Sequence, residues 1–368
     1  MKKICWVTSE WLVDVDIPII PELLDNYKIH WIIVLYPNGR FKESYFDKFK
    51  TLKNLEIEFV IVKHRARHPR TMIDYFQLLL SLRRVGADIN YIDMTPSSPY
   101  MILPYLLMPS NKTIFAAHDG SIKPIMGPLV KWFFKLGYGL HSRFVHMFSK
   151  SQAEEFNINY PGKFVTVIPL MPKYYGAASN CVKNNVVSFL SFGTMHEEKN
   201  IGLLIRAAEE LYNEGVTNFK VSICGKAPSN WDDLYGKFIV HQALFNLQLR
   251  MIDNEEIPNL FSSHSFAVYP YKIMSQSGAL KVAYAYNIPV ITSNLPAFRE
   301  EVCDGINGYV FESNNIDSLK NVLRRCISMP PEKYSSLVNS TRDYINTNYS
   351  AKAIKNKYIE MFEKVLNL

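Results

Sequence analysis

Short apolar segments alternate with segments of helical spacing along almost the whole chain, and this alternation limits the possible folds. The apolar segments of the first half that predict strands are Ile4–Thr8, His30–Tyr36, Glu56–Val62, Asn90–Met94, Thr113–His118, Phe144–Ser149 and Val165–Ile168. Those of the second half are Val186–Phe192, Lys220–Cys224, Leu247–Ile252, Phe266–Tyr269, Val290–Thr292 and Tyr309–Phe311. Strands that are apolar along their whole length and separated by helices predict a parallel sheet covered on both faces. We therefore expect an α/β protein.

The length of the chain and one irregular segment predict two domains. A chain of 368 residues exceeds what one hydrophobic core usually organises. Residues 171–185 lack periodicity and are rich in Pro, Gly, Asn and Ser, which is typical of a linker. We expect a first domain over residues 1–170, a second over residues 186–345, and a last helix over residues 346–368. The clearest helical patterns are Met72–Val85, Ile201–Asn213, Glu255–Ser263, Glu332–Ile345 and Ala351–Leu368, the last of them capped by Ser350.

Composition and charge limit the class of protein. A hydrophobic content of 48% with 20% charged residues is that of a globular chain, and no apolar run of about 18 residues predicts a membrane span. Five cysteines without a C-x-x-C pair, after an N-terminus that does not resemble a secretion signal, indicate reduced and mostly buried thiols in a cytoplasmic protein.

The basic charge is concentrated in the first half of the chain. Of the net charge of +7, residues 1–170 carry +6, from 21 Lys and Arg against 15 Asp and Glu. The first domain is therefore the half that would meet an anionic membrane or a phosphate-bearing acceptor, unless this is an ordinary basic surface. No nucleic-acid-binding motif accompanies the charge.

Two segments of the second half have the pattern of an anion-binding site. In the segment Ser265–Phe311, a strand, a Ser-Gln-Ser-Gly turn, a helix and a second strand follow one another. This order places backbone N–H groups at a helix N-terminus, where they can bind an anion. In the segment Ser188–Leu211, a strand ends before Gly193 and Lys199 lies at the start of a helix. A lysine and a helix N-terminus together suit a diphosphate, although each segment also fits a plain capped helix start.

These two segments resemble the donor-binding region of glycosyltransferase family 4, in the GT-B superfamily. The family's G-x-x-R-x-x-K loop corresponds here to Gly193, His196 and Lys199, with histidine in place of arginine. The family's two glutamates, eight positions apart, fall at Met274 and Val282, so the chain resembles a variant branch with Ser-Gln-Ser-Gly in place of the first glutamate. The resemblance implies two Rossmann-like, doubly wound parallel-sheet domains that face each other across a cleft.

The resemblance also implies which residues bind a nucleotide-sugar donor. Besides Gly193, His196 and Lys199, these are Gly225, Met251, Ser275, Gln276, Ser277, Gly278 and Glu300. Glu300 alternatively compensates the dipole at the start of a short helix. Lys281, next to the second vacant acid position, is a further residue that could point at the nucleotide.

The acceptor side is expected in the first domain. His118 and Asp119 follow a predicted strand, where side chains face the ligand crevice of such folds, and we assign them a catalytic role, although a lone histidine is often structural. Glu10, after the first strand, is a possible base. The basic run Lys63–Arg70 contains the other acceptor or membrane residues, Arg65, Arg67 and Arg70, and suits a lipid diphosphate or anionic headgroups as well as it suits a solvated loop. The stretch Lys123–Leu140 fits an interfacial amphipathic helix or a core helix.

Together these features predict a cytoplasmic, hexosyltransferase-type enzyme that is peripheral to the inner face of the plasma membrane. It would move a sugar from a UDP- or GDP-sugar to a saccharide acceptor on a polyprenyl-diphosphate lipid, in the synthesis of capsule, O-antigen or exopolysaccharide. The resemblance implies retention of anomeric configuration. No metal-binding motif is present, and we expect no metal and no cofactor beyond the donor. The vacant glutamate positions leave an alternative, an inactive relative that binds nucleotide-sugar or glycan and supports a partner enzyme.

Overall fold

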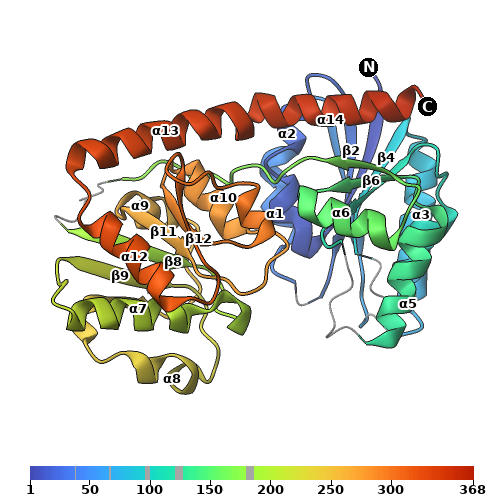
Figure 1. Cartoon of the computed structure of the whole chain (residues 1–368). Coiled ribbons are helices and arrows are strands. Elements are labelled where there is room, and N and C mark those ends of the chain that lie inside the picture. Colours follow the sequence, from blue (N-terminus) through green and yellow to red (C-terminus); the bar gives the residue numbers. More distant parts are fainter. Residues whose placement is uncertain (38, 66–67, 96–99, 121–126, 180–185) are drawn as a thin grey trace. The chain divides into compact units, whose positions relative to one another are not determined.

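The computed structural model describes residues 1–37, 39–65, 68–95, 100–120, 127–179 and 186–368. Its chain divides into two units, each with its own sheet (Figure 1): unit 1 comprises Met1–Met171 with Ala351–Leu368, and unit 2 comprises Pro172–Ser350. The last helix therefore belongs to the unit that begins the chain. Arg67, Cys181 and the first residues of the stretch Lys123–Leu140 lie outside the described residues.

Unit 1 is built on a parallel sheet. The strand order in its described part is β3-β2-β1-β4-β5-β6-β7, and every neighbouring pair is parallel. These strands are β1 (Lys3–Ser9), β2 (Lys28–Leu35), β3 (Leu55–Ile61), β4 (Ile89–Asp93), β5 (Thr113–Ala117), β6 (Phe144–Met147) and β7 (Phe164–Val167). The central strands are buried along their whole length, as strands covered on both faces must be.

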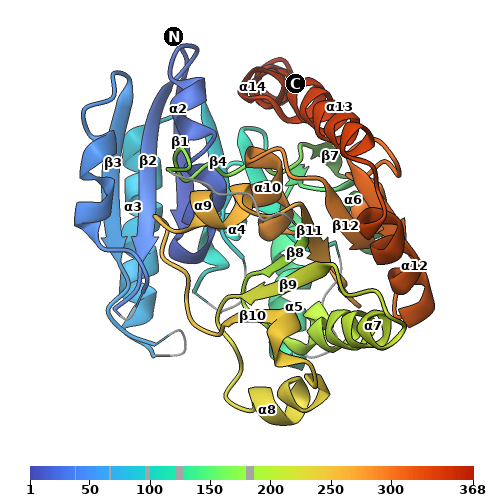
Figure 2. The same ribbon diagram turned by 90° about the vertical axis from the view of Figure 1, so that its left-hand side faces the viewer.

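Helices cover both faces of this sheet (Figure 2). On one face pack α1 (Val13–Asp16), α2 (Ile20–Leu23), the 3-10 helix η2 (Glu43–Phe49) and α14 (Ala351–Leu366). On the other pack α3 (Thr71–Val85), α4 (Leu103–Leu107), α5 (Pro128–Leu136), the π-helical turn η3 (Gly137–His141) and α6 (Lys150–Asn159). Gly86, with a φ of 58°, ends α3 in the left-handed conformation that favours glycine.

Unit 2 contains a second parallel sheet. Its strand order within the described residues is β10-β9-β8-β11-β12-β13. The strands are β8 (Val187–Phe192), β9 (Phe219–Cys224), β10 (Phe245–Gln248), β11 (Phe266–Tyr269), β12 (Val290–Ser293) and β13 (Gly308–Phe311). The helices are α7 (Ile201–Asn213), α8 (Trp231–Leu234), α9 (Ile257–Ser262), α10 (Gly278–Ala285), α11 (Pro296–Arg299), α12 (Ile316–Ile327) and α13 (Pro331–Tyr349).

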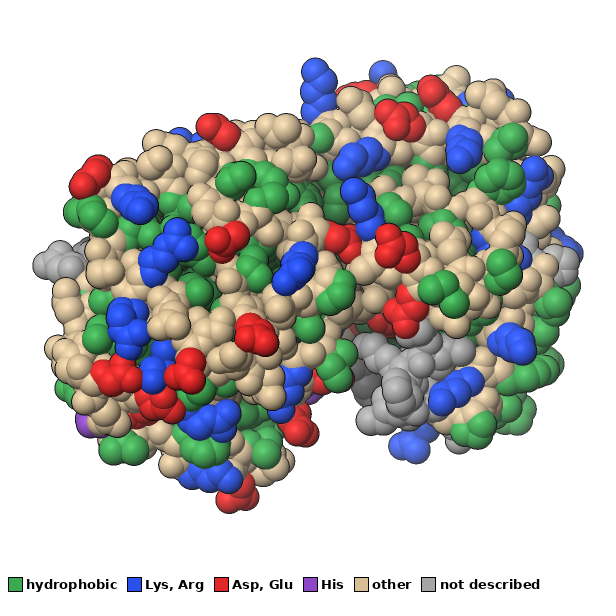
Figure 3. Space-filling view, viewed as in Figure 1, with side chains coloured by type: hydrophobic (Ala, Val, Ile, Leu, Met, Phe, Trp, Pro, Cys, Tyr) green, Lys and Arg blue, Asp and Glu red, His purple; other side chains and the backbone are tan. Residues whose placement is uncertain are grey.

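Charges of both signs are interspersed on the face of unit 2 drawn in Figure 3. On α12, Lys320 lies 2.9 Å from the carboxylate of Glu210 and 2.7 Å from that of Glu214, both at the end of α7. Arg324, one turn further along α12, pairs with Glu214 as well. The near balance of charge predicted for the second half thus takes the form of local ion pairs.

The structure also bears on the cysteines and on membrane-spanning helices. In the described part of the chain, Cys5, Cys224, Cys303 and Cys326 are free thiols, and all except Cys303 are buried. Burial raises the pKa of Cys5 to about 12, so this thiol stays protonated at neutral pH. None of the described helices has the length and apolarity required to cross a lipid bilayer.

Candidate functional site

The strand order of unit 2 opens a crevice between two loops. Strand β8 has β9 on one side and β11 on the other, so the loops that follow β8 and β11 lead away in opposite directions. In open parallel sheets, ligands bind at this point, outside the carboxyl ends of the strands. The two loops are residues 193–200 and 270–277, which are the segments that the sequence assigns to the donor.

Two glycines pack the loops of this edge backbone against backbone. Gly193 has a φ of 121° and Gly225 a φ of 144°, which only glycine adopts readily. A Cβ atom on Gly225 would lie 2.1 Å from the carbonyl oxygen of Gly193. The amide of Gly193 donates to Cys224 (3.0 Å), and the amide of Gly225 donates to Gln248 (2.9 Å). The loops after β8, β9 and β10 therefore form one connected floor.

Lys199 lies where this floor meets the loop after β11. It ends the 3-10 turn Glu197–Lys199 directly before α7, and its Nζ atom is 3.7 Å from the centre of the Tyr271 ring. The amide of Lys272 donates to the carbonyl of Glu198 (2.9 Å), which ties the two loops together. The lysine is thus held between the two predicted phosphate-binding segments, while His196 is exposed on the same loop.

The Ser-Gln-Ser-Gly turn opens helix α10. The hydroxyl of Ser277 accepts the amide of Leu280 (3.2 Å) and caps the helix. A Cβ atom on Gly278 would meet no atom within 4 Å, so the first turn of the helix faces open space. The segment therefore fits both interpretations given by the sequence, a capped helix start and an anion-binding turn. It caps the helix, and it leaves the N-terminus of the helix accessible.

The remaining donor-side residues lie near the same edge with different surroundings. Met251 is exposed in the segment after β10, beside Arg250, whose guanidinium contacts both oxygens of Glu256 at 2.8 and 2.6 Å. Ser275 and Gln276 are partly buried between β11 and α10. Glu300 is also partly buried and follows the last residue of α11.

The sheet of unit 1 has a corresponding opening between β1 and β4. Glu10, directly after β1, is buried, and its carboxylate accepts the amides of Tyr36 (3.0 Å) and Phe41 (2.9 Å). These bonds shape the loop after β2. Glu10 is therefore engaged in positioning that loop, which is a task that its sequence position alone did not indicate.

A cavity of about 750 Å³ lies at this edge of unit 1. Its walls are aromatic and charged: the exposed Trp11 ring stacks on Tyr36, with centroids 4.7 Å apart, and the lining includes Lys63, Arg65 and Arg40. Arg40 is paired with the carboxylate of Asp14, which also lines the cavity, at 2.7 Å. Of the other basic residues of the loop after β3, Arg70 is exposed directly before α3 and does not line the cavity.

His118 pairs with an acid that sequence reasoning missed. Its Nε2 atom lies 2.8 Å from the Oδ1 atom of the fully buried Asp93 at the end of β4, and its ring stacks on Phe148. Burial, and then the neighbouring Asp93 carboxylate, raise the pKa of Asp16 well above its ordinary value. Asp119, the predicted partner, is only partly buried in the turn that follows. The sequence could have indicated Asp93 as a site residue, because it is an acid at the carboxyl end of a buried strand.

No group of three or more His, Cys, Asp or Glu side chains in the described residues has the arrangement of a metal site.

Comparisons with known proteins agree with this geometry. The sequence model of the family described as glycosyl transferases group 1 matches residues 180–344. We call these residues the group 1 domain, after the family model that they match. The comparison with curated proteins gives no match. A glycosyltransferase from Rickettsia africae ESF-5 has the same fold, with a TM-score of 0.77 at 16% identity over 99% of this chain and 98% of that chain.

Two further solved structures extend the likeness to the whole chain. The sucrose-phosphate synthase of Thermosynechococcus elongatus has a TM-score of 0.74 at 11% identity over 100% of both chains. Anabaena Alr3699/HepE in complex with UDP and glucose has a TM-score of 0.71 at 12% identity over 99% of this chain and 100% of that chain. These matches confirm the predicted GT-B fold with two Rossmann-like parallel-sheet domains.

Two predictions within the group 1 domain are wrong. Lys281 does not point at a nucleotide: its side chain is buried 2.5 Å from the Glu301 carboxylate and 3.9 Å from the centre of the Tyr349 ring. Glu300 does not begin a helix, because Pro296 starts α11 and Glu300 lies at its C-cap, so it does not compensate the dipole there.

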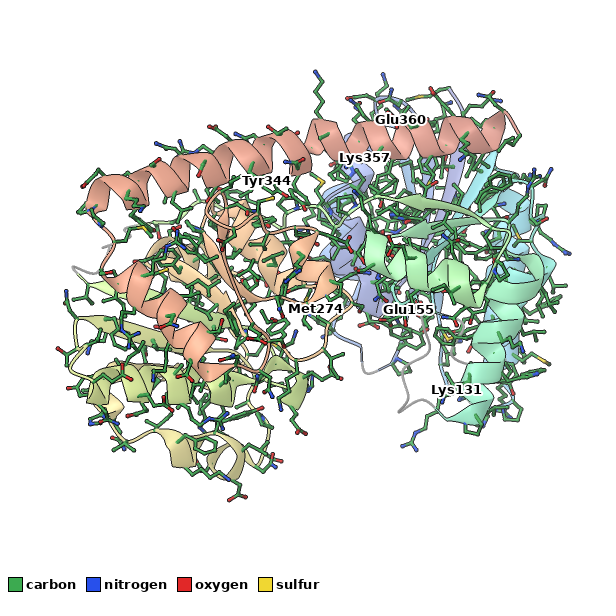
Figure 4. All side chains as sticks on the ribbon, in the orientation of Figure 1. Lys131, Glu155, Met274, Tyr344, Lys357 and Glu360 are labelled. Atoms are coloured by element: carbon green, nitrogen blue, oxygen red, sulfur yellow. The ribbon has the colours of Figure 1, made fainter. Side chains whose placement is uncertain are left out.

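The two vacant acid positions of the group 1 domain differ in their surroundings. Met274, labelled in Figure 4, lies on the segment that leads into α10 and is partly buried. Val282 is only 3% exposed and belongs to a hydrophobic core on α10. A carboxylate at position 282 would have to be buried in that core, so the second acid has no place in this packing.

A Lys199→Met variant of the group 1 domain should bind nucleoside diphosphates about 10- to 100-fold more weakly, because a charge-assisted contact to phosphate contributes on the order of 1.5–3 kcal/mol. Its melting temperature should change little, since Lys199 is only partly buried. Calorimetric titration with UDP and GDP measures the effect. Lys333→Met, at an exposed lysine on α13, is the matched control. Equal affinity in Lys199→Met and the control would remove Lys199 from the site.

Proposed function

We propose that this chain transfers a hexosyl group from a UDP- or GDP-sugar to a saccharide acceptor. The observation that carries the proposal is the edge of unit 2, where the Gly193–Gly225 floor, Lys199 and the first turn of α10 lie at the carboxyl ends of neighbouring strands. A cation and free N–H groups are what a departing diphosphate requires as it gains charge. The Anabaena relative, whose structure contains UDP and glucose, supports a donor of this class.

Within this proposal, each donor residue has a role. Lys199 and the α10 N-terminus hold the diphosphate, and His196 adds a hydrogen bond where the family has arginine. Gly193 and Gly225 allow the backbone to approach the phosphates. Met251 lies beside the nucleobase, and Glu300 lies beside the sugar or ribose.

The acceptor is assigned to unit 1. The aromatic walls of the cavity at Trp11 and Tyr36 suit the apolar face of a sugar ring, and the cations at Lys63 and Arg65 suit a diphosphate. A saccharide carried on a polyprenyl diphosphate combines both features. We therefore propose an enzyme of surface polysaccharide synthesis that acts at the cytoplasmic face of the plasma membrane.

His118 is the proposed catalytic group of the acceptor side. Asp93 fixes the ring by its contact with Nε2. Asp119, the next residue in the chain, is the second residue to which we assign a catalytic role. Retention of configuration, which the family resemblance implies, is part of the proposal, and no acid at position 274 or 282 contributes to it.

One observation favours a second function. Because Val282 lies in a closed hydrophobic core and Met274 cannot ionise, neither usual glutamate can be supplied by a small rearrangement. An inactive relative that binds nucleotide-sugar or glycan for a partner enzyme has the same donor edge without turnover.

A panel of nucleotides tests the proposal. One of UDP, GDP, TDP and CMP, at about 100 times its dissociation constant, should stabilise the protein by about 2.7 kcal/mol and raise its melting temperature by several degrees. The matching sugar nucleotide is then incubated with saccharide acceptors while nucleotide release is measured. Release that depends on acceptor supports the transferase, binding without release supports the inactive relative, and no binding at all overturns both.

A further inference from the structure

Exposed hydrophobic side chains gather on one face of unit 1. Of the twenty large hydrophobic residues that are exposed in the described part of the chain, eight lie on α3, α4, α5 and η3. They are Met72, Ile73, Phe76, Leu80, Leu107, Leu129, Trp132 and Leu140. Contiguous exposed apolar surface is rare on a soluble protein unless it binds something.

Helix α3 shows that this exposure is not a by-product of core packing. Tyr75, Leu78 and Leu82 on its inner side are buried against the sheet and already supply its hydrophobic contact. Met72, Phe76 and Leu80, spaced four residues apart, form a second apolar stripe on the opposite side, and each is at least half exposed. The helix is therefore apolar on a side that packs against no described part of the chain.

The same surface continues over the neighbouring helices. Helix α4 packs beside α3 on one side and beside η3 on the other, and η3 continues α5. On α5, Leu129 and Trp132 are three residues apart, and each is 54% exposed. In Figure 3, hydrophobic and basic side chains are visible along the right-hand edge, where Figure 1 places α3 and α5. The large apolar side chains of α5 thus lie on two sides, because Phe133 is buried while Leu129 and Trp132 are exposed.

The charges around this surface are of one sign. Arg70 and Arg83 at the ends of α3 and Lys135 on α5 are exposed, and Lys131 is partly exposed. The sole acid of α3, Asp74, is buried and accepts the amide of Lys63 (3.1 Å). From Met94 to Ala153 the sequence contains six Lys and Arg but only one acid, Asp119. Among the described residues, no ion pair links Arg70, Arg83, Lys131 or Lys135 to a carboxylate of this chain.

We propose that the outer face of α3, α4 and α5 docks onto a bilayer that contains anionic lipids. Apolar side chains of this length enter the boundary between headgroups and acyl chains, and a tryptophan suits that depth. Lysine and arginine stems extend to the phosphates, each contributing about 1 kcal/mol near a charged surface. The lack of exposed acids on these helices favours an anionic lipid surface over a second copy of this chain. This inference deepens the proposed function. The link between the docking face and a lipid-borne acceptor rests on that proposed function.

Co-sedimentation with vesicles tests this docking. The full chain should bind vesicles made of equal parts of phosphatidylglycerol and phosphatidylcholine at low salt, and should bind pure phosphatidylcholine at least about tenfold more weakly. Ile73→Ser combined with Phe76→Ser should reduce binding to the anionic vesicles by about tenfold or more, because both side chains contribute apolar area to the bilayer. Lys131→Gln combined with Lys135→Gln should mainly make vesicle binding less dependent on salt concentration.

Control variants distinguish binding through this face from nonspecific adsorption to vesicles. Ile158→Ser combined with Val240→Ser removes two side chains that are even more exposed, at 81% and 72%, but lie elsewhere, and should leave vesicle binding unchanged. Brominated lipids should quench the fluorescence of Trp132, and a Trp132→Phe variant gives the background signal. This measurement reports contact between Trp132 and the lipid without use of the double variants. Binding that is equal in wild type and Ile73→Ser/Phe76→Ser, or absent quenching, overturns the proposal.

Two further measurements identify other outcomes. If sedimentation velocity shows a dimer that Ile73→Ser/Phe76→Ser dissociates, the occupant is a second copy and the bilayer proposal is wrong. The same double variant should keep the nucleotide affinity of the wild type in solution. If the double variant loses vesicle binding but still binds nucleotide, the result supports the docking role of this face and leaves the donor site untouched. If the wild type binds vesicles but no nucleotide, only the proposed transferase function is contradicted.

Discussion

A Gly225→Ala variant should lose the ordered donor edge of unit 2 and with it all measurable binding of a nucleoside diphosphate. The new Cβ atom would lie 2.1 Å from the carbonyl oxygen and 2.6 Å from the carbonyl carbon of Gly193. Both are backbone atoms, so no side chain can rotate away. The φ of 144° adds strain of about 1–3 kcal/mol for any residue with a side chain. The loops after β8 and β9 would have to separate.

Gly215→Ala distinguishes this clash from strain alone. Gly215 also has a positive φ, 88°, but a Cβ atom there would meet nothing within 4 Å. It should cost about 1 kcal/mol and leave nucleotide binding intact. Hydrogen exchange of the β8 and β9 amides and titration with UDP and GDP measure both variants. If Gly225→Ala binds nucleotide as Gly215→Ala does, the packed glycine floor is not part of the donor site.

The central strands were predictable because burial on both faces makes each one a mostly apolar run. Predicted and observed strands of unit 1 agree to within two residues at each end. The largest error is in β10, predicted as Leu247–Ile252 and observed as Phe245–Gln248. This strand lies at the edge of its sheet and is partly exposed throughout, so its sequence lacks the apolar run that marks the others.

The position of the donor edge was predictable for a topological reason. Carboxyl ends of parallel strands share one edge, so loops that follow successive strands must meet there. Gly193, Lys199 and Gly278 therefore could be assigned to one site before any contact was known. The same reasoning placed Glu10 and His118 at the corresponding edge of unit 1.

Side-chain partners were not predictable, because they depend on how strands and helices are placed next to each other. His118 was assigned a catalytic role together with its sequence neighbour Asp119, and its contact with Asp93, at the end of the adjacent strand, was not foreseen. Glu10 was read as a base, yet its carboxylate holds the amides of a loop about thirty residues away. Such pairings arise between distant segments, where sequence periodicity carries no information.

A Lys281→Met variant should destabilise unit 2 by about 3–5 kcal/mol at neutral pH, because it leaves the Glu301 carboxylate buried without its cation. The two side chains are only 2% and 9% exposed, so solvent cannot replace the lost partner. The variant also loses the contact of the Lys281 ammonium with the Tyr349 ring. Because the two units can unfold separately, hydrogen exchange of the α10 amides is the appropriate measurement. Lys272→Met, at an exposed lysine on the preceding segment, is the matched control and should be nearly neutral.

The double variant and the pH dependence identify the cause. Lys281→Met with Glu301→Leu removes both charges and should recover most of the stability, since a buried ion pair can often be replaced by apolar side chains at little cost. Burial already raises the pKa of Glu301, and loss of the lysine raises it further. The folded variant then binds a proton more readily than the unfolded chain, so its unfolding free energy increases as pH falls through the folded-state pKa. The deficit relative to wild type should therefore shrink in acid, and a deficit that stays constant with pH would instead attribute the loss to packing around Tyr349.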